Sequence, residues 1–349
     1  MSTMNVTYYD TRRKNILSAI INLYLETGQP VSSRGICRRF RFGLSPATIR
    51  NVMADLEDTG YLTHTHISAG RVPTDIGYRY YVDYIMHPQR MSDEEERAIE
   101  EEYLMDTSEI EEVFRKTSRV LSAVTDCAGL ILIPGFERWV LGRVEIISVS
   151  PRRAMLILVT DSGIVKSSFF NLDADSSERE LGMIASFLNS ELKGMSISEI
   201  KDFIERKMLA ERSSLHFIFK KALDIMESAV PHDEGHVYLD GIPNILDKMD
   251  LGEVEQMRRI LKIIDDKSKF IKIMNRAIEW EGVKVHIGAE NEDEEINIFS
   301  LISSSYRVKG RPAGSIAVLG PKRLNYAKAV YMVKYMSDKL SDIMTGLSR

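Results

Sequence analysis

The chain contains 349 residues, of which 44% are hydrophobic and 28% charged, and its formal net charge is -5. This length predicts two or three domains, and the composition excludes a disordered or fibrous protein. The apolar runs are too short to cross a bilayer, no secretory signal is visible, and Cys37 and Cys127 cannot form a zinc quartet. We therefore expect a cytoplasmic protein with no membrane segment, metal or cofactor.

Charge is distributed unevenly along the chain. Residues 11–50 carry eight Lys and Arg side chains and one acid, Glu26, whereas residues 91–112 carry eleven acids and one base, Arg97. A local basic patch can bind a polyanion such as DNA, and the alternative is a solvated helix face. We interpret the acidic run as the solvated face of a helix that links domains, although mimicry of nucleic acid is also open.

The first predicted helix covers residues 11–27, where apolar side chains recur at helical spacing and Gly28 follows as a terminator. A second, short helix begins at Ser32 or Ser33 and runs to about Phe42. A tight turn containing glycine then leads to a third helix. Two helices joined in this way predict a helix-turn-helix, and the alternative is a three-helix packing module.

The third helix has a capped start and two distinct faces. Ser45 can cap it and Pro46 occupies its first position. Apolar residues at helical spacing predict its buried stripe: Ile49, Val52, Met53 and Leu56. On the other faces, Asn51 can pair with adenine, Arg50 can reach guanine or phosphate, and the methyl group of Thr48 can meet thymine. This helix is the predicted recognition helix.

A small hairpin is predicted directly after this helix. Gly60 ends the helix, residues 61–66 are strand-like, and residues 68–71 form a turn that carries an arginine at the hairpin tip. Another helix follows over residues 74–86. This order is typical of a winged helix, in which the wing contacts phosphates or the minor groove.

At this point the chain resembles the heat-inducible transcription repressor family, HrcA. The resemblance is carried by four segments: Leu44–Leu62, His66–Thr74, Gly77–Asp83 and Gly320–Tyr326, the last with a glycine-proline-basic motif before the final helix. It therefore spans essentially the whole chain. Two residues of the wing depart from the family pattern: Ile67, where threonine is usual, and Thr65, where proline is common.

The resemblance implies a repressor that binds double-stranded DNA as a homodimer, at the inverted repeat CIRCE upstream of heat-shock chaperone genes. It also implies that the GroE chaperonin supports the active form. A two-fold dimer presents two recognition helices to two half-sites, which an inverted repeat provides. The expected base-reading residues are Thr48, Arg50 and Asn51. The expected phosphate and wing contacts are Arg12, Arg13, Lys14, Ser33, Arg38, Arg39, Arg41, Ser45, Ser68, Gly70 and Arg71.

Beyond the linker, strands alternate with a helical block. Strands are predicted at 139–149, 154–160, 164–170, 237–239, 283–287, 296–306 and 314–319, and helices at 177–230, 254–278 and 324–344. This order suggests one α+β sheet interrupted by an insertion, and the resemblance implies a GAF-like domain with an inserted dimerisation domain. The expected division is a winged-helix domain (1–87), a helical linker (88–125), a GAF-like domain (126–195 and 276–349) and the insertion (196–275).

No catalytic constellation is visible, so we do not expect an enzyme. His64 and His66 could chelate a metal from one strand face, but two ligands without a third make a weak site. His232 and His236 flank a loop of mixed charge. Two alternatives remain. One is a winged-helix regulator with a small-molecule effector in the GAF-like cavity, and the other is an enzyme on a winged-helix scaffold, which the missing constellation disfavours.

Overall fold

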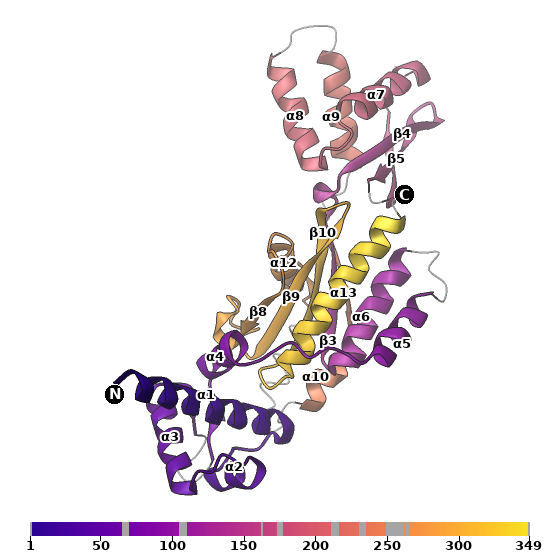
Figure 1. Cartoon of the computed structure of the whole chain (residues 1–349). Coiled ribbons are helices and arrows are strands. Elements are labelled where there is room, and N and C mark those ends of the chain that lie inside the picture. Colours follow the sequence, from indigo (N-terminus) through magenta and orange to yellow (C-terminus); the bar gives the residue numbers. More distant parts are fainter. Residues whose placement is uncertain are drawn as a thin grey trace.

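The computed structural model describes residues 2–64, 70–104, 110–161, 163–172, 177–210, 216–229, 235–248, 262 and 266–347. Figure 1 shows three units along one long axis, and the mixed α+β class expected from the sequence is confirmed. We call them the N-terminal unit (2–84), the inserted unit (136–229) and the central unit, which comprises the described residues of 85–134 and 235–347.

The N-terminal unit contains four helices and a two-stranded hairpin. Its elements are α1 (Ser2–Thr27), α2 (Ser33–Arg39), α3 (Pro46–Asp58), β1 (Leu62–Thr63), β2 (Val72–Pro73) and α4 (Asp75–Tyr84). All four expected helices are present, although α1 begins before Thr11 and α2 ends at Arg39, short of Phe42. Ser32 caps α2, because its hydroxyl accepts a hydrogen bond from the Gly35 amide.

The central unit is organised around a five-stranded antiparallel sheet with the order β7-β3-β10-β9-β8. Its strands are β3 (Ala128–Pro134), β7 (Gly235–Asp240), β8 (Lys284–Ile287), β9 (Phe299–Val308) and β10 (Arg311–Pro321). The last three confirm the expected C-terminal strands. The strand expected at 237–239 is β7, which pairs with β3 so that Pro134 lies opposite Gly235.

Helices cover both faces of this sheet (Figure 1). One face carries α6 (Ile110–Thr125) and α13 (Tyr326–Leu347), with α5 (Asp93–Leu104) beside them; the other carries α10 (Ile242–Lys248) and α12 (Lys267–Ala277). Helix α6 buries an apolar stripe that includes Val113, Phe114, Val120 and Leu121. Both faces of the sheet are therefore core, as its nearly continuous apolar strands β3 and β10 require.

The acidic segment that begins after residue 91 is anchored to the central unit. Ser92 and Glu95 form a capping box, with the Glu95 amide 3.2 Å from Ser92 Oγ and the Ser92 amide 2.9 Å from Glu95 Oε2. Glu100 of α5 accepts a hydrogen bond from Lys339 of α13 at 2.7 Å. At least one acid of residues 91–112, Glu100, is therefore bound to the central unit and does not only face solvent.

The inserted unit consists of a three-stranded antiparallel sheet and three helices. Its elements are the 3-10 turn η1 (Phe136–Arg138), β4 (Leu141–Ser150), β5 (Arg153–Thr160), β6 (Val165–Asn171), α7 (Glu178–Glu191), α8 (Ile197–Ala210) and α9 (His216–Ala229). The expected meander of strands is confirmed. One sheet face packs on the helices, while exposed apolar residues lie on the outer strands, including Ile147 and Phe169.

This arrangement corrects the expected division of the chain. The strands of 141–171, assigned to the GAF-like body, form a sheet of their own, and their inner residues share a separate core with α7 to α9. Helix α12, mostly assigned to the insertion of 196–275, packs instead on the five-stranded sheet. Helix α12 corresponds to the second part of the helix expected at 254–278, and the residues of that span before 266, apart from Lys262, lie outside the described ranges. Amphipathic strands show that one face is buried but not which helices bury it.

Candidate nucleic-acid interface

Helix α3 has a capped N-terminus and one buried face. Ser45 Oγ accepts a hydrogen bond from the Thr48 amide at 3.1 Å, and Pro46 occupies the first turn. The predicted stripe is buried against α1 and α2: Ile49, Val52, Met53 and Leu56. The predicted orientation of the helix is therefore confirmed, and its opposite face is left to solvent.

The solvent face of α3 carries two of the three side chains expected to read bases. Arg50 and Asn51 are exposed, and so is the small side chain of Ala47 beside them. Thr48 is half-buried, and its Oγ1 lies 2.9 Å from Ser45 Oγ, so that its hydroxyl takes part in the N-terminal cap. Arg50 and Asn51 are consequently better placed than Thr48 to reach base edges in a groove.

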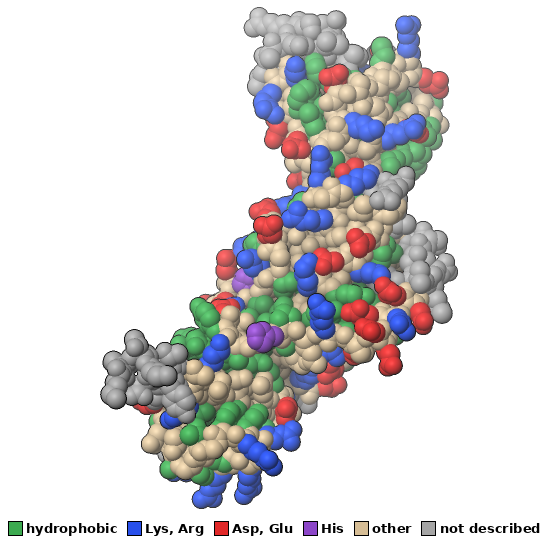
Figure 2. All heavy atoms as spheres, viewed as in Figure 1, with side chains coloured by type: hydrophobic (Ala, Val, Ile, Leu, Met, Phe, Trp, Pro, Cys, Tyr) green, Lys and Arg blue, Asp and Glu red, His purple; other side chains and the backbone are tan. Residues whose placement is uncertain are grey.

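Lys and Arg side chains gather at the end of the molecule formed by the N-terminal unit (Figure 2). Of those expected to contact phosphates, the exposed ones are Arg38, Arg39 and Arg41, and the half-buried ones are Arg12, Arg13 and Lys14. Arg13 lies 3.9 Å from Asp55 of α3, which ties α1 to the recognition helix. Arg39 lies 3.4 Å from Glu26, and because both side chains are exposed, DNA could displace this pair at little cost.

The three serines of the expected phosphate set lie in different environments. Ser45 is exposed, whereas Ser33 is only 7% exposed, so its hydroxyl is withdrawn from the surface. Ser68 lies outside the described residues, as do both wing positions that depart from the family pattern. Contacts of the hairpin tip therefore stay predictions.

Gly70 positions the hairpin through its backbone. The amides and carbonyls of Val31 and Arg71 exchange hydrogen bonds of 2.9 and 2.8 Å, which join the hairpin to the segment between α1 and α2. A Cβ on Gly70 would lie 2.5 Å from the Val31 oxygen and 2.6 Å from that of Pro30. Only glycine allows this close approach. Gly70 thus has a packing role that its sequence position in a turn did not indicate.

Arg71 does not extend from the hairpin tip as expected. Its Nε donates to Glu57 Oε2 of α3 at 2.7 Å, and His64 Nδ1 contacts the other oxygen of the same carboxylate. Partial desolvation acts to raise the pKa of Glu57, but the hydrogen bond with His64 and the charge of Arg71 outweigh it and hold this pKa below its ordinary value. Glu57 therefore fixes the hairpin beside α3.

The histidine pairs considered as metal ligands are not supported by the described residues. His64 is engaged by Glu57, and His66 and His232 lie outside the described ranges. His236 packs edge-on against Tyr238, with ring centroids 4.6 Å apart. Within those ranges, no group of three His, Cys, Asp or Glu could hold a metal ion. No described helix has the length and apolarity needed to cross a membrane.

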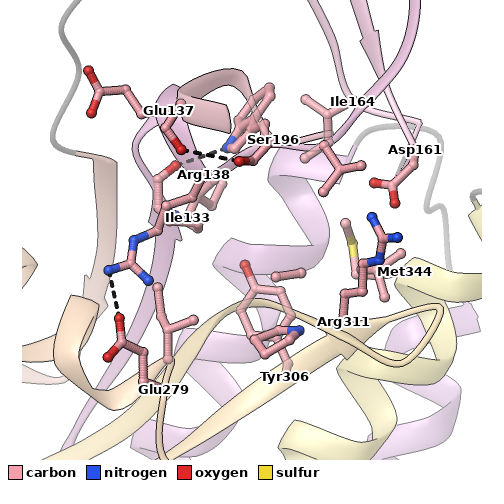
Figure 3. Close-up of a pocket in the computed structure, with 18 residues that line it drawn as sticks. Ile133, Glu137, Arg138, Asp161, Ile164, Ser196, Glu279, Tyr306, Arg311 and Met344 are labelled. Atoms are coloured by element: carbon pink, nitrogen blue, oxygen red, sulfur yellow. Dashed lines mark hydrogen bonds and ion pairs between the residues drawn. The ribbon is translucent and has the colours of Figure 1, made fainter. Parts of the chain in front are cut away.

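A cavity of about 530 Å³ lies where the central and inserted units meet (Figure 3). Tyr306 of β9 and Arg311 of β10 line it from the central unit, and Asp161 lines it from the inserted unit. At its margin Arg138 binds Glu279 at 3.1 Å. Its size is that of a small-molecule site, but its charged side chains have both signs and select no single ligand class.

Taken together, the fold and this surface define a multi-unit α+β protein with a capped, solvent-facing helix in a basic unit at one end. Residues 111–330 match the family model described as HrcA protein C terminal domain. The Heat-inducible transcription repressor HrcA of Pelotomaculum thermopropionicum is 35% identical, over 97% of this chain and 98% of its own length. That of Desulforudis audaxviator is 36% identical, over 97% and 99%. The chain belongs to the heat-inducible transcription repressor HrcA family.

A solved structure described as a hypothetical protein at 2.2 Å resolution has the same fold. It covers 96% of this chain and 98% of its own, with a TM-score of 0.60 and 24% identity. This likeness covers nearly the whole of both chains and is a likeness of fold.

Proposed function

We propose that the chain is a transcriptional repressor of heat-shock chaperone genes that binds the inverted repeat CIRCE as a homodimer. The observation that carries the proposal is the exposed face of α3, where Arg50 and Asn51 project from a capped helix inside a basic unit. Family membership supports the repressor role. In this proposal residues 1–87 act as a winged helix, α3 enters the major groove, and the hairpin lies over the adjacent backbone or minor groove.

Individual side chains take different roles in this complex. Arg50 and Asn51 read base edges, with Thr48 contributing its methyl group. Arg12, Lys14, Arg38, Arg39 and Arg41 contact phosphates, together with Ser45 and the predicted wing contact Ser68. Arg13 and Arg71 act mainly by holding α1, the hairpin and α3 together, because Asp55 and Glu57 already engage them. Gly70 acts by allowing the hairpin backbone to approach Pro30 and Val31 closely. Ser33 is left out because it is buried.

The homodimer is proposed to form through the inserted unit, with the five-stranded sheet as a GAF-like body. Cross-strand pairing places Ile147, Met155 and Phe169 in one row across β4, β5 and β6. Ile147 and Phe169 are 42% and 52% exposed, and Val149 and Val165 on the same strands are 54% and 62% exposed. A cluster of exposed apolar side chains on one sheet is a favourable surface for a second copy of the chain.

The test is a titration of labelled CIRCE duplex and of a scrambled duplex with the purified protein, followed by fluorescence anisotropy at several salt concentrations. We expect at least a ~1,000-fold preference for CIRCE, and an affinity that falls steeply as salt rises because phosphate contacts release counterions. Equal, weak binding to both duplexes would contradict the proposal.

The family resemblance further supports dependence on the GroE chaperonin. In this proposal the folded population of the protein sets operator occupancy, and the chaperonin raises that population until unfolded proteins occupy it. Occupancy of CIRCE should then increase on addition of GroE, with a larger increase at higher temperature. Occupancy that stays constant with and without GroE at every temperature would exclude this dependence.

A second candidate function is regulation by a small-molecule effector, favoured by the cavity shown in Figure 3. A ligand there would touch the central and inserted units at once and could couple them. A metabolite screen by thermal shift would test it. A ligand that raises the melting temperature of wild-type protein but not of an Arg311→Ala variant, and that changes CIRCE affinity, would support this function.

A further inference from the structure

Helix α4 joins the N-terminal unit to the central unit through two ion pairs. Asp75, in the first turn of α4, lies 2.7 Å from Lys322 Nζ, and its Oδ2 accepts a hydrogen bond from the Ala289 amide at 3.0 Å. Arg79, one turn later, donates from Nε to Glu290 Oε1 at 2.8 Å. These four side chains are 28–34% exposed, so solvent screens them less than a surface pair.

The backbone around the second pair is also engaged. A second nitrogen of Arg79 donates to the carbonyl of Val285 in the edge strand β8, and Glu290 Oε2 accepts from the Ile287 amide at 2.9 Å. The planar guanidinium therefore binds a carboxylate and a main-chain oxygen of the central unit at once, which restricts the rotation of α4 about its own axis.

Aromatic packing and a glycine complete the contact. The ring of Tyr78 lies 5.6 Å from that of Tyr326, whose hydroxyl donates to the Lys322 carbonyl at 2.8 Å. On the other side of the contact, a Cβ on Gly28 would lie 1.6 Å from the Arg323 guanidinium, so this cation occupies the space that the glycine leaves at the end of α1. We call the two ion pairs and this packing the junction.

The junction is connected to the recognition helix by short, rigid steps. Thr74, which caps α4, donates its hydroxyl to the Gly60 carbonyl at 2.6 Å, and Gly60 follows α3 directly. A Cβ on Gly77 would lie 2.2 Å from the carbonyl oxygen of Tyr61, so α4 touches this segment with no side chain between them. A rotation of α4 would therefore carry α3 with it.

From these contacts we infer that the junction sets the orientation of α3 relative to the central unit, so that in the homodimer it selects the spacing of the two operator half-sites. The inference rests on the proposed function. Asp75, Arg79, Glu290 and Lys322 are positioning residues that need not touch DNA. A dimer whose units are rigidly joined accepts half-sites only at the separation and helical phase that its two recognition helices present.

The experiment uses full-length protein and labelled duplexes that carry CIRCE, CIRCE with its half-sites moved apart by about 5 base pairs, or one half-site. The junction variant is Lys322→Gln with Glu290→Gln, because glutamine removes both charges yet still accepts from the Ile287 amide. Wild type should lose at least ~100-fold in affinity on the shifted duplex, which offers only one half-site at a time. The variant should lose less than ~10-fold, while both bind the single half-site equally.

The control removes a Lys–carboxylate pair that lies within the central unit and does not join it to the N-terminal unit. Lys334→Gln with Asp338→Asn removes the exposed pair on α13, and this variant should discriminate spacing as wild type does. Lys322→Arg, which keeps the charge, should also behave as wild type. Equal half-site affinity shows that the recognition helix of each variant is folded.

The outcomes separate the two proposals. A junction variant that binds CIRCE specifically but loses as much affinity on the shifted duplex as wild type overturns the inference alone. Wild-type protein that binds CIRCE and scrambled duplex equally overturns the proposed function, and the inference with it.

Discussion

Arg71 of the hairpin and Glu57 of the recognition helix form an ion pair, with Arg71 Nε 2.7 Å from Glu57 Oε2. The pair places the second strand of the hairpin at a defined position beside α3. An arginine expected to project toward DNA is therefore first a structural contact within the N-terminal unit. Its effect on DNA binding should pass largely through the geometry of the hairpin.

Glu57→Gln should reduce the pH dependence of stability. Because the pKa of Glu57 is lowered on folding, its contribution is fully present above the ordinary value of 4.5 and is lost as pH falls through the lowered pKa. At pH 7 the free energy of unfolding of the variant should be about 0.5–1.5 kcal/mol below that of wild type, a modest value because the pair is partly exposed. The difference should shrink towards pH 3, because wild type loses the same contribution there. Denaturation curves between pH 7 and 3 measure both effects.

Glu26→Gln is the control for this change, because the Glu26–Arg39 pair is exposed on both sides. Its effect at pH 7 should stay below ~0.5 kcal/mol. A Glu57→Gln protein as stable as wild type at pH 7, with the same acid sensitivity, would show that the pair contributes nothing.

Gly70→Ala should destabilise the N-terminal unit by about 1–3 kcal/mol, because the new methyl group would overlap the oxygens of Pro30 and Val31. Gly182→Ala is the matched control: Gly182 lies in α7 with nothing within 4 Å of an added Cβ, and alanine should stabilise the helix slightly. Thermal unfolding of both variants compares them. If the Gly70→Ala and Gly182→Ala proteins have equal melting temperatures, Gly70 does not approach the backbone of Pro30 and Val31 as closely as the structure indicates.

Asn51→Ala and Arg50→Ala should each weaken CIRCE binding by roughly 1–3 kcal/mol while leaving the scrambled duplex almost unchanged. Arg39→Ala should instead weaken both duplexes alike and lower the dependence on salt. Anisotropy titrations at two salt concentrations distinguish the patterns. If Asn51→Ala keeps the wild-type ratio between specific and scrambled DNA, Asn51 does not read a base.

Phe169→Asp should convert the proposed dimer to a monomer, because it places a charge at one end of the apolar row on the inserted sheet, where the native side chain is 52% exposed. Met183→Asp on α7, which is 45% exposed in the same unit, is the matched control and should remain dimeric. Light scattering gives the mass of each. If the Phe169→Asp protein remains dimeric, the dimer interface does not include this row.

The local features of α3 could be predicted from sequence, because its cap and stripe depend on residues within a few positions of one another. The cap at Ser45 and the burial of Ile49 and Leu56 follow from helix geometry alone. The contacts of Arg71 could not be predicted, since its partner Glu57 is fourteen residues away and is reached only when the hairpin closes. A sequence pattern shows the arginine but not the direction of its side chain.

The division of the chain was wrong for the same reason: a sequence pattern does not show contacts between distant segments. Strands were predicted at 139–149, 154–160 and 164–170, but a strand-like segment does not show which of two sheets it joins. The pairing of β3 with β7 connects segments on either side of the whole insertion. The ion pair between Asp75 and Lys322 joins residues that are 247 positions apart in the sequence, a relationship that no local pattern encodes.

The pairing of β3 with β7 also makes the inserted unit the loop of a β-hairpin. The chain leaves the five-stranded sheet at Pro134 and returns opposite it at Gly235. A disordered loop becomes costlier to close as it lengthens, whereas a folded one holds its own ends together. Folding of the inserted unit therefore favours the pairing of β7, which lies at the edge of the sheet and also packs on α6 and α12. Heat that melts the inserted unit would weaken the pairing of this edge strand in the same event.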